Sequence, residues 1–316
     1  MLSSHRIQTA AQSDEILKVL ANTIRSYPLN FREARILSGM EEAMYEWITI
    51  NYILKAFPMS GVFEIGMKEK IHGALDLGGA STQISFMPLE AISNKTTEAK
   101  FELFGYNYSI YTHSYLCYRK EESNKRDLAA LLKGKDLTVP IENPCYLKGY
   151  MTSTTLDYIF GSPCTSDKKP SPYDKKQERN SRWNRKTRKM SGNCENALQL
   201  YSMSWKQVMC IYGVYQPPIN GKFFAFSAFY YITEFFNLIS KRASLKTSLA
   251  ENPKVPKFRL KNYCTDGWIL LTLLVDGYKF DHSTWKNIKF QKKILQHEIG
   301  WSLGYMLNAS RMNIKM

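Results

Sequence analysis

Apolar side chains recur at helical spacing in residues 13–27, which open with a serine and two acids and stop before Pro28. Four of them share one face: Ile16, Leu17, Leu20 and Ile24. This pattern predicts an amphipathic helix. The short apolar run Ala34–Leu37 that follows predicts a strand.

A second helix is predicted from Glu41 to Phe57, just after Ser38 and Gly39. Its apolar face carries Met44, Trp47, Ile48 and Tyr52. Glu41 and Glu42 fall in its first turn, where the helix dipole favours carboxylates. Capping is therefore the simpler explanation of this acidic pair, and catalysis is the alternative.

Two hairpins are expected next. Residues 72–86, HGALDLGGASTQISF, place an Asp, two glycines and a Ser between two short strand-like runs, and residues 101–110 alternate around Gly105. The middle of the chain predicts mostly loops. Three further helices are predicted over Phe223–Ile239, Asp266–Val275 and Leu295–Asn308.

The composition indicates a folded chain, because 44% of its 316 residues are hydrophobic and 13% are aromatic. The longest apolar run, Gly267–Val275, falls far short of the roughly 20 residues that span a bilayer. The first fifteen residues hold no continuous apolar stretch, so we expect no secretory signal or membrane helix in this sequence.

The net charge of +15 comes from 43 basic and 28 acidic residues, but it is unevenly spread. Residues 167–189 contain ten Lys or Arg against three acids and predict a loop. A basic loop could bind heparin, nucleic acid or anionic lipid, yet a solvated insertion is the commoner outcome. We therefore expect a loop insertion at 165–190 and no nucleic-acid partner.

Six cysteines are scattered at wide spacings, without a CxxC pair, which disfavours zinc. They are Cys117, Cys145, Cys164, Cys194, Cys210 and Cys264. Their even number, with glycosylation sequons at Asn94, Asn107 and Asn308, predicts a disulfide-bonded glycoprotein in the secretory lumen or outside the cell. Because such a protein needs a signal, we expect the amino terminus to be incomplete.

The hairpin at 72–86 carries residues suited to phosphate chemistry. Gly78 and Gly79 would let backbone N–H groups approach phosphate oxygens closely. Asp76 could hold a hydrated divalent cation, while Ser81 and Gln83 could orient an attacking water. A plain structural turn is the alternative for a GG hairpin.

ALDLGGASTQISF resembles the fourth conserved region of the ecto-nucleoside triphosphate diphosphohydrolases, or ecto-apyrases, and SGMEEAMYEWITINYIL resembles their third. FFAFSAFYY and IGWSLGYMLN resemble the fifth region and its surroundings. The similarity runs from about Ser13 to about Asn308, and the cell-surface members of the family are nearest. It implies an α/β, actin-like (RNase H-like) two-lobed nucleotidase that uses Ca²⁺ or Mg²⁺ to cleave terminal phosphates from nucleoside tri- and diphosphates.

The resemblance also assigns roles to individual residues. It makes Glu42 the general base, with Ser81 and Gln83 holding the attacking water. Asp76 would hold the metal through water, with Trp301 near the metal site. The phosphate loop would be the backbone of Gly78, Gly79 and Ala80, and Tyr231 with Arg259 would sandwich the nucleobase. A core tyrosine and a solvated arginine are the alternatives for the last two.

The chain departs from the family pattern in several places. The DxGSSxT phosphate loop, the TAGMR-like second region and the flanking membrane helices do not occur in it, and Met40-Glu41-Glu42-Ala43 replaces Gln-Glu-Glu-Gly. A further glycine is replaced by Glu46. Each lost phosphate donor is worth about 3 kcal/mol in a water-excluded site, so we expect slow catalysis.

The resemblance implies three segments: 1–38 as a remnant of the first lobe, 39–290 as a nearly complete second lobe, and 291–316 as a return to the first lobe. It also pairs Cys117 with Cys164 and Cys145 with Cys194, and leaves Cys210 and Cys264 without their family partners. We expect an apyrase at the outer face of the plasma membrane or in the secretory lumen. A nucleotide-binding homologue without turnover, or a non-functional product, are the alternatives.

Overall fold

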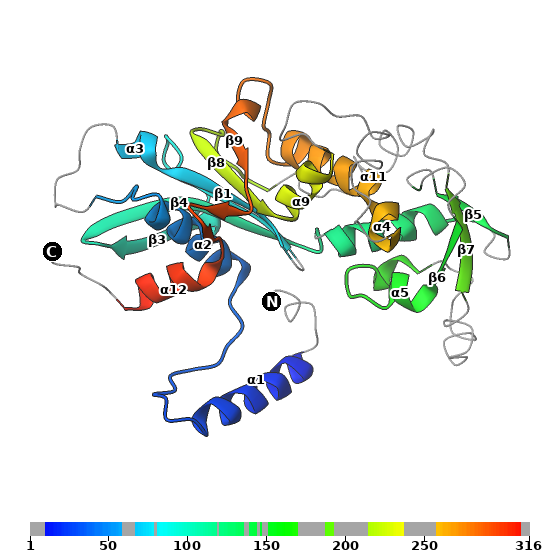
Figure 1. The fold of residues 1–316 in the computed structure, drawn as a ribbon, viewed down its shortest axis with the longest axis horizontal. Coiled ribbons are helices and arrows are strands. Elements are labelled where there is room, and N and C mark those ends of the chain that lie inside the picture. The colour runs from blue at the N-terminus through cyan, green and yellow to red at the C-terminus, as the bar shows by residue number, and fades with distance from the viewer. Residues whose placement is uncertain are drawn as a thin grey trace.

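The computed structural model describes residues 10–58, 67–78, 81–118, 120–135, 139–143, 146, 151–169, 187–192, 214–236 and 257–310. Among these residues, a six-stranded sheet in the order β3-β4-β2-β1-β8-β9 forms the centre of the molecule (Figure 1). Its strands are β1 (His72–Leu77), β2 (Ser81–Phe86), β3 (Glu98–Leu103), β4 (Tyr106–Leu116), β8 (Lys222–Ser227) and β9 (Ile288–Phe290). β1, β8 and β9 run parallel, and β2, β4 and β3 join them through two antiparallel hairpins. The mixed sheet fits the actin-like fold expected from the sequence.

Helices cover both faces of this sheet. They are α2 (Gly39–Ile53), α9 (Ala228–Phe235), α11 (Lys257–Thr272) and α12 (Trp301–Ala309). A π-helical turn, η7 (Leu273–Gly277), follows α11. α2 and α12 pack on the face that carries Ala74 and Phe226, while α9, α11 and η7 pack on the face that carries Leu75 and Ala225. β1, β2 and β8 are therefore buried on both sides, and the apolar run of β8 is typical of such a strand.

α12 packs closely on α2 because Gly304 lacks a side chain. A Cβ at Gly304 would lie 1.9 Å from the carbonyl oxygen of Tyr45. The Gly304 N–H also donates to Thr49 Oγ1 at 2.8 Å. The ring of Tyr305, one residue further along α12, meets the ring of Tyr45 edge to face at 5.4 Å between centroids. This contact fixes the position of α2 over the sheet.

A smaller part of the molecule lies beyond the end of β4, on the right in Figure 1. It contains α4 (Lys120–Leu132), α5 (Leu156–Phe160) and a three-stranded sheet of β5 (Ile141–Asn143), β7 (Thr187–Gly192) and β6 (Met151–Thr155). Leu128, Leu132 and Ile159 belong to its own hydrophobic core. The predicted disulfide between Cys117 and Cys164 is confirmed, with its Cα atoms 5.5 Å apart, and it joins β4 to the loop after α5.

The remaining described elements are short, except for α1. They are α1 (Ala10–Arg25), α3 (Met67–Lys70), β10 (Lys293–Ile294), β11 (His297–Glu298), and the 3₁₀ turns η2 (Lys95–Thr97), η3 (Ser166–Lys168) and η8 (Trp285–Asn287). The predicted amphipathic helix is present as α1, which lies apart from the central sheet in Figure 1. Two residues of its apolar face are open to solvent, since Ile16 and Leu20 are each 42% exposed.

Three expectations about secondary structure were wrong in whole or in part. Residues 34–37 are not a strand, and they pair with no described strand. The run 223–239 begins as a strand, β8, and turns helical only at Ala228, because β8 is apolar toward both faces of the sheet. The last helix starts at Trp301 rather than at Leu295, since residues 293–298 form the β10–β11 hairpin.

Several other expectations lie outside the described residues. The pair Cys145 and Cys194, Cys210, and most of the basic loop at 165–190 fall there. Within the described part, residues 187–189 of that loop belong to β7, and the backbone of Cys264 lies in α11. No described helix has the length and apolar character needed to cross a membrane.

Candidate active site

The start of α2 separates the two acidic residues that the sequence left ambiguous. Ser38 Oγ accepts from the Glu41 N–H at 3.2 Å, and Glu41 Oε2 accepts from the Ser38 N–H at 2.9 Å. This is a reciprocal capping box, and it occupies Glu41. Glu42 takes no part in the box and is 8% exposed. Capping therefore explains Glu41 and leaves Glu42 for another role.

Arg35 holds Glu41 in its capping position. Its guanidinium lies 2.8 Å from Glu41 Oε1 and also pairs with Glu33 at 3.0 Å. Burial opposes ionisation of Glu41, but hydrogen bonds from Arg35 and Ser38 outweigh it, and the pKa of the Glu41 carboxyl is lowered. The charge at this helix end is thus compensated without Glu42.

Glu42, Gln83 and Ser81 are joined by hydrogen bonds. Gln83 Nε2 donates to Glu42 Oε2 at 2.8 Å and to Ser81 Oγ at 2.9 Å. All three side chains are buried. The opposite end of the amide, Gln83 Oε1, is buried and has no hydrogen-bond partner among the described residues. β2 and α2 therefore meet in one polar cluster that retains an unused acceptor.

Asp76 lies directly across the hairpin from Gln83, in the register that pairs β1 with β2. It is 5% exposed. The hairpin closes with the Gly78 N–H donating to the Ser81 carbonyl at 3.0 Å. A Cβ at Gly78 would lie 2.5 Å from Asp76 Oδ2, so the glycine makes room for this carboxylate. The glycine at position 78 is thus required by its neighbour and not only by the turn.

A buried hydroxyl pair supports the base of the hairpin. Thr82 Oγ1 donates to the Asp76 carbonyl at 2.7 Å and lies 2.9 Å from the Tyr278 hydroxyl, which belongs to the residue after η7. Complete burial raises the pKa of Tyr278 well above its ordinary value, so this residue stays a neutral hydrogen-bonding group. The sequence did not indicate either residue, because they lie 196 positions apart.

For the other expected site residues, the structure gives a position but not every side chain. Tyr231 lies in α9 and is 47% exposed, so it is not a core tyrosine. Arg259 lies in α11, but its side chain is outside the described part, as are Gly79 and Ala80. Trp301 begins α12, and its ring meets Tyr305 edge to face at 6.4 Å between centroids.

Ser227 is a residue of this edge that sequence reasoning missed. It ends β8 with φ 56° and ψ −128°, a conformation that non-glycine residues rarely adopt. It lies beside Leu77 in the parallel register of β8 with β1, and its side chain does not cap α9. Backbone strain of this kind gathers at functional sites, although nothing in the sequence signals it.

The described residues suit a metal ion that is bound partly by the protein and partly by the substrate. No three acidic, histidine or cysteine side chains in the described part gather closely enough to bind a metal ion alone. Asp76 offers one buried carboxylate, close in the hairpin to the side-chain oxygens of Ser81 and Gln83. Mg²⁺ commonly binds proteins through only one or two carboxylates, with waters and substrate phosphates completing its coordination. Asp76 is therefore the side chain through which such an ion would be held.

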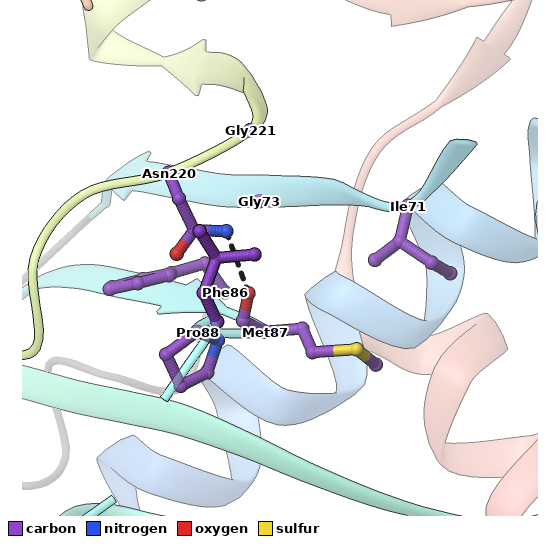
Figure 2. Close-up of a pocket in the computed structure, with 8 residues that line it drawn as sticks. Ile71, Gly73, Phe86, Met87, Pro88, Asn220 and Gly221 are labelled. Carbon is purple, nitrogen blue, oxygen red and sulfur yellow. Dashed lines mark hydrogen bonds between the residues drawn. The ribbon is translucent and has the colours of Figure 1, made fainter. Parts of the chain in front are cut away.

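A small cavity lies at the opposite end of the same sheet (Figure 2). It is lined by Ile71, Gly73, Phe86, Met87, Pro88, Leu89, Asn220 and Gly221. Asn220 Nδ2 donates to the Met87 carbonyl at 3.1 Å, as the dashed line in Figure 2 shows. The cavity volume of about 30 Å³ suits a single water molecule and is far too small for a nucleotide.

Comparison with known proteins shows the family of the chain. A family model described as GDA1/CD39 (nucleoside phosphatase) matches residues 4–315. Ectonucleoside triphosphate diphosphohydrolase 8 of Gallus gallus is 40% identical over 329 residues, which cover 97% of this chain and 65% of that protein. Ectonucleoside triphosphate diphosphohydrolase 1 of Mus musculus is 34% identical, covering 97% of this chain and 64% of that protein. The chain thus spans about 65% of the length of these curated relatives.

A solved structure shares the fold. The crystal structure of nucleoside triphosphate hydrolases from Neospora caninum matches with a TM-score of 0.63, covering 96% of this chain and 70% of that one. The sequence identity is 12%, so this likeness speaks for the architecture alone. It agrees with the actin-like arrangement of the central sheet.

Proposed function

Because the chain belongs to the GDA1/CD39 (nucleoside phosphatase) family, we propose that it hydrolyses the terminal phosphate of nucleoside tri- and diphosphates with the help of Ca²⁺ or Mg²⁺. The observation that carries the proposal is the Gln83 amide, which joins the Glu42 carboxylate to the Ser81 hydroxyl beside Asp76. A carboxylate and a hydroxyl held by one amide suit the activation of a water molecule.

In this proposal Glu42 is the general base. It removes a proton from a water molecule that Ser81 and the unused Oε1 of Gln83 hold in place. The water oxygen bonds to the terminal phosphorus, and the bond from that phosphorus to its bridging oxygen breaks. Inorganic phosphate and a nucleotide shortened by one phosphate are released. The backbone of Gly78, Gly79 and Ala80 would hold the phosphates, as their flexible turn allows.

The metal ion would neutralise phosphate charge when bound, and Asp76 would hold it through water. Trp301 would flank this side of the site. At the far end of the substrate, Tyr231 and Arg259 would enclose the nucleobase. The exposure of Tyr231 supports this role, because a ring that stacks on a ligand must have an accessible face.

We also place the chain in the secretory lumen or outside the cell. The Cys117–Cys164 disulfide supports this setting, since such bonds persist in oxidising compartments. Asn107 lies exposed on the β3–β4 hairpin and Asn94 precedes η2, so both sequons are positions for glycosylation. The three segments 1–38, 39–290 and 291–316 remain our proposed division of the chain.

The test is a phosphate-release assay on the whole chain with ATP and ADP, with Ca²⁺ or Mg²⁺ present or chelated. Glu42→Gln should lower kcat by about 10²- to 10⁴-fold with KM little changed, because a general base acts on the transition state. Glu41→Gln, one residue away in the capping box, is the matched control and should retain activity.

Three results would decide against this reading. Equal activity in Glu42→Gln removes the general base. Release that continues in chelator removes the metal. Nucleotide binding by the wild-type chain without any phosphate release would support the alternative, a nucleotide-binding homologue without turnover.

A further inference from the structure

The carboxyl ends of three parallel strands lie side by side at one edge of the central sheet. β1 ends before Gly78, β8 ends at Ser227, and the chain after β9 continues along β8, with the Gln291 N–H donating to the Ala225 carbonyl at 3.0 Å. Ligands of α/β sheets bind outside the carboxyl ends of parallel strands. The residue after Gln291 therefore lies on the edge that carries the candidate active site.

That residue, Lys292, contacts Tyr231. Its Nζ lies 5.7 Å from the centroid of the Tyr231 ring, within the range of a cation–π interaction. Tyr231 follows Ser227 by four residues in α9, so the pair lies beside the end of β8. Sequence reasoning did not indicate Lys292, which stands in a run of two lysines.

Neighbouring lysines show what distinguishes this contact. Lys289 also lies over an aromatic ring, that of Phe224 at 5.6 Å, but Phe224 is a core residue with 3% exposure. Lys293 pairs with Glu298 at 3.9 Å. Lys292 has no carboxylate partner among the described residues, and it faces a ring with 47% of its surface exposed. A flat aromatic ligand could therefore lie between the Lys292 ammonium and the Tyr231 ring.

We propose that Lys292 forms the wall of the nucleobase site that faces Tyr231; this inference rests on the proposed function. A base stacked on Tyr231 would lie about 3.5 Å from the ring, and the ammonium would need a similar gap of about 3.5–4 Å on its other side. The present 5.7 Å separation falls short of the sum by less than 2 Å. Lys292 is exposed, and the four-carbon stem of a lysine rotates readily, so a small side-chain movement opens the site.

In this inference Lys292, rather than Arg259, is the cation on the other side of the base from Tyr231. Arg259 belongs to α11, whereas Lys292 follows β9 on the sheet edge itself. Removing Lys292 and removing Arg259 should therefore have different effects on nucleotide affinity. Only the one that covers the base will discriminate a nucleotide from a bare phosphate chain.

The experiment compares ADP with inorganic pyrophosphate, each with Mg²⁺, by isothermal titration calorimetry on the whole chain. Lys292→Ala should weaken ADP binding roughly threefold to tenfold and leave pyrophosphate binding unchanged, because a cation–π wall touches the base alone. Lys293→Ala removes the same charge one residue away and should change neither. Lys292→Arg should retain ADP affinity, and circular dichroism confirms that the variants are folded.

The outcomes separate the inference from the function on which it rests. An equal loss for ADP and pyrophosphate would make Lys292 a general phosphate contact and overturn the inference. An unchanged ADP affinity in Lys292→Ala, with a loss only in Arg259→Ala, would overturn it in favour of Arg259. A wild-type chain that binds neither ligand would overturn the proposed function together with the inference.

Discussion

The carboxylate of Glu42 accepts a hydrogen bond of 2.8 Å from the side-chain amide of Gln83, which lies 41 residues further along the chain. Because a carboxylate only accepts hydrogen bonds, the amide nitrogen must face it and the amide oxygen must face away. The same nitrogen reaches Ser81 Oγ at 2.9 Å. One amide therefore fixes the orientation of both groups assigned to the attacking water.

Removing this amide should slow the reaction without weakening binding. Gln83→Ala frees Glu42 and Ser81 to turn away from the water, and a small misplacement of catalytic groups costs about 10²-fold in rate. Steady-state kinetics with ATP should show the loss in kcat and little change in KM. The control is Ser85→Ala, on the same strand as Gln83, which removes a buried hydrogen bond to Thr112 of β4. A KM effect as large as the kcat effect would mean that Gln83 binds the substrate instead.

A methyl group at position 78 should disturb the metal requirement. The Cβ of Gly78→Ala would lie 2.5 Å from Asp76 Oδ2, so the carboxylate must turn away. We expect phosphate release by this variant to need a higher Mg²⁺ or Ca²⁺ concentration for half-maximal activity. Gly300→Ala, where an added Cβ has nothing within 4 Å, should keep the wild-type metal titration. An unshifted titration in Gly78→Ala would argue against Asp76 as the metal-holding residue.

Gly304→Ala should loosen the packing of α12 on α2. The added Cβ would lie 1.9 Å from the Tyr45 carbonyl, and the N–H bond to Thr49 would be strained as the helices separate. Overpacking of this kind costs about 1–3 kcal/mol, which urea unfolding would measure. Gly300→Ala at the start of the same helix should cost about 0.5 kcal/mol or less. Equal stability of the two variants would show that α12 adjusts freely.

The capping box at the start of α2 should make a pH-dependent contribution to stability. The folded-state pKa of Glu41 is lowered from its ordinary value of 4.5 by hydrogen bonds from Arg35 and Ser38, so folding favours the ionised form. This contribution is full above pH 4.5 and is lost as the pH falls through the lowered folded-state pKa. Glu41→Gln should therefore destabilise the chain by about 1 kcal/mol at pH 7, and the difference should shrink in acid.

Thermal unfolding from pH 7 to pH 3 would measure this effect. Glu33→Gln is the control, because Glu33 pairs with the same Arg35 but caps nothing. A Glu41→Gln deficit that stays constant down to pH 3 would show that the carboxylate charge is not what stabilises the helix.

Local patterns in the sequence were enough for the elements that turn residues or helical spacing mark. The hairpin at 72–86 and the helix that begins near Glu41 were predicted with small errors at their ends. Turn residues and period-3.6 spacing depend on near neighbours, so they are readable along the chain. The Cys117–Cys164 pair and the candidate residues Glu42, Asp76, Ser81 and Gln83 came from family resemblance to short motifs.

The strand β8 shows where such reading fails. Phe223 and Ala225 enter the core on one face of the sheet, and Phe224 and Phe226 enter the core on the other. A strand buried on both faces has no alternation of apolar and polar positions, so its sequence cannot be told from that of a buried helix. The expected helix over 223–239 was therefore wrong at residues 223–227.

The sequence by itself determined the family, the α/β class and the residue types available for phosphate chemistry. Only the tertiary structure decided that Glu41 caps its helix while Glu42 meets Gln83, that Tyr278 supports Thr82, and that Lys292 faces Tyr231. Local spacing sets which face of an element a side chain occupies. Its partner depends on strand register and on the packing of helices over the sheet, and these are set by contacts between residues far apart in the chain.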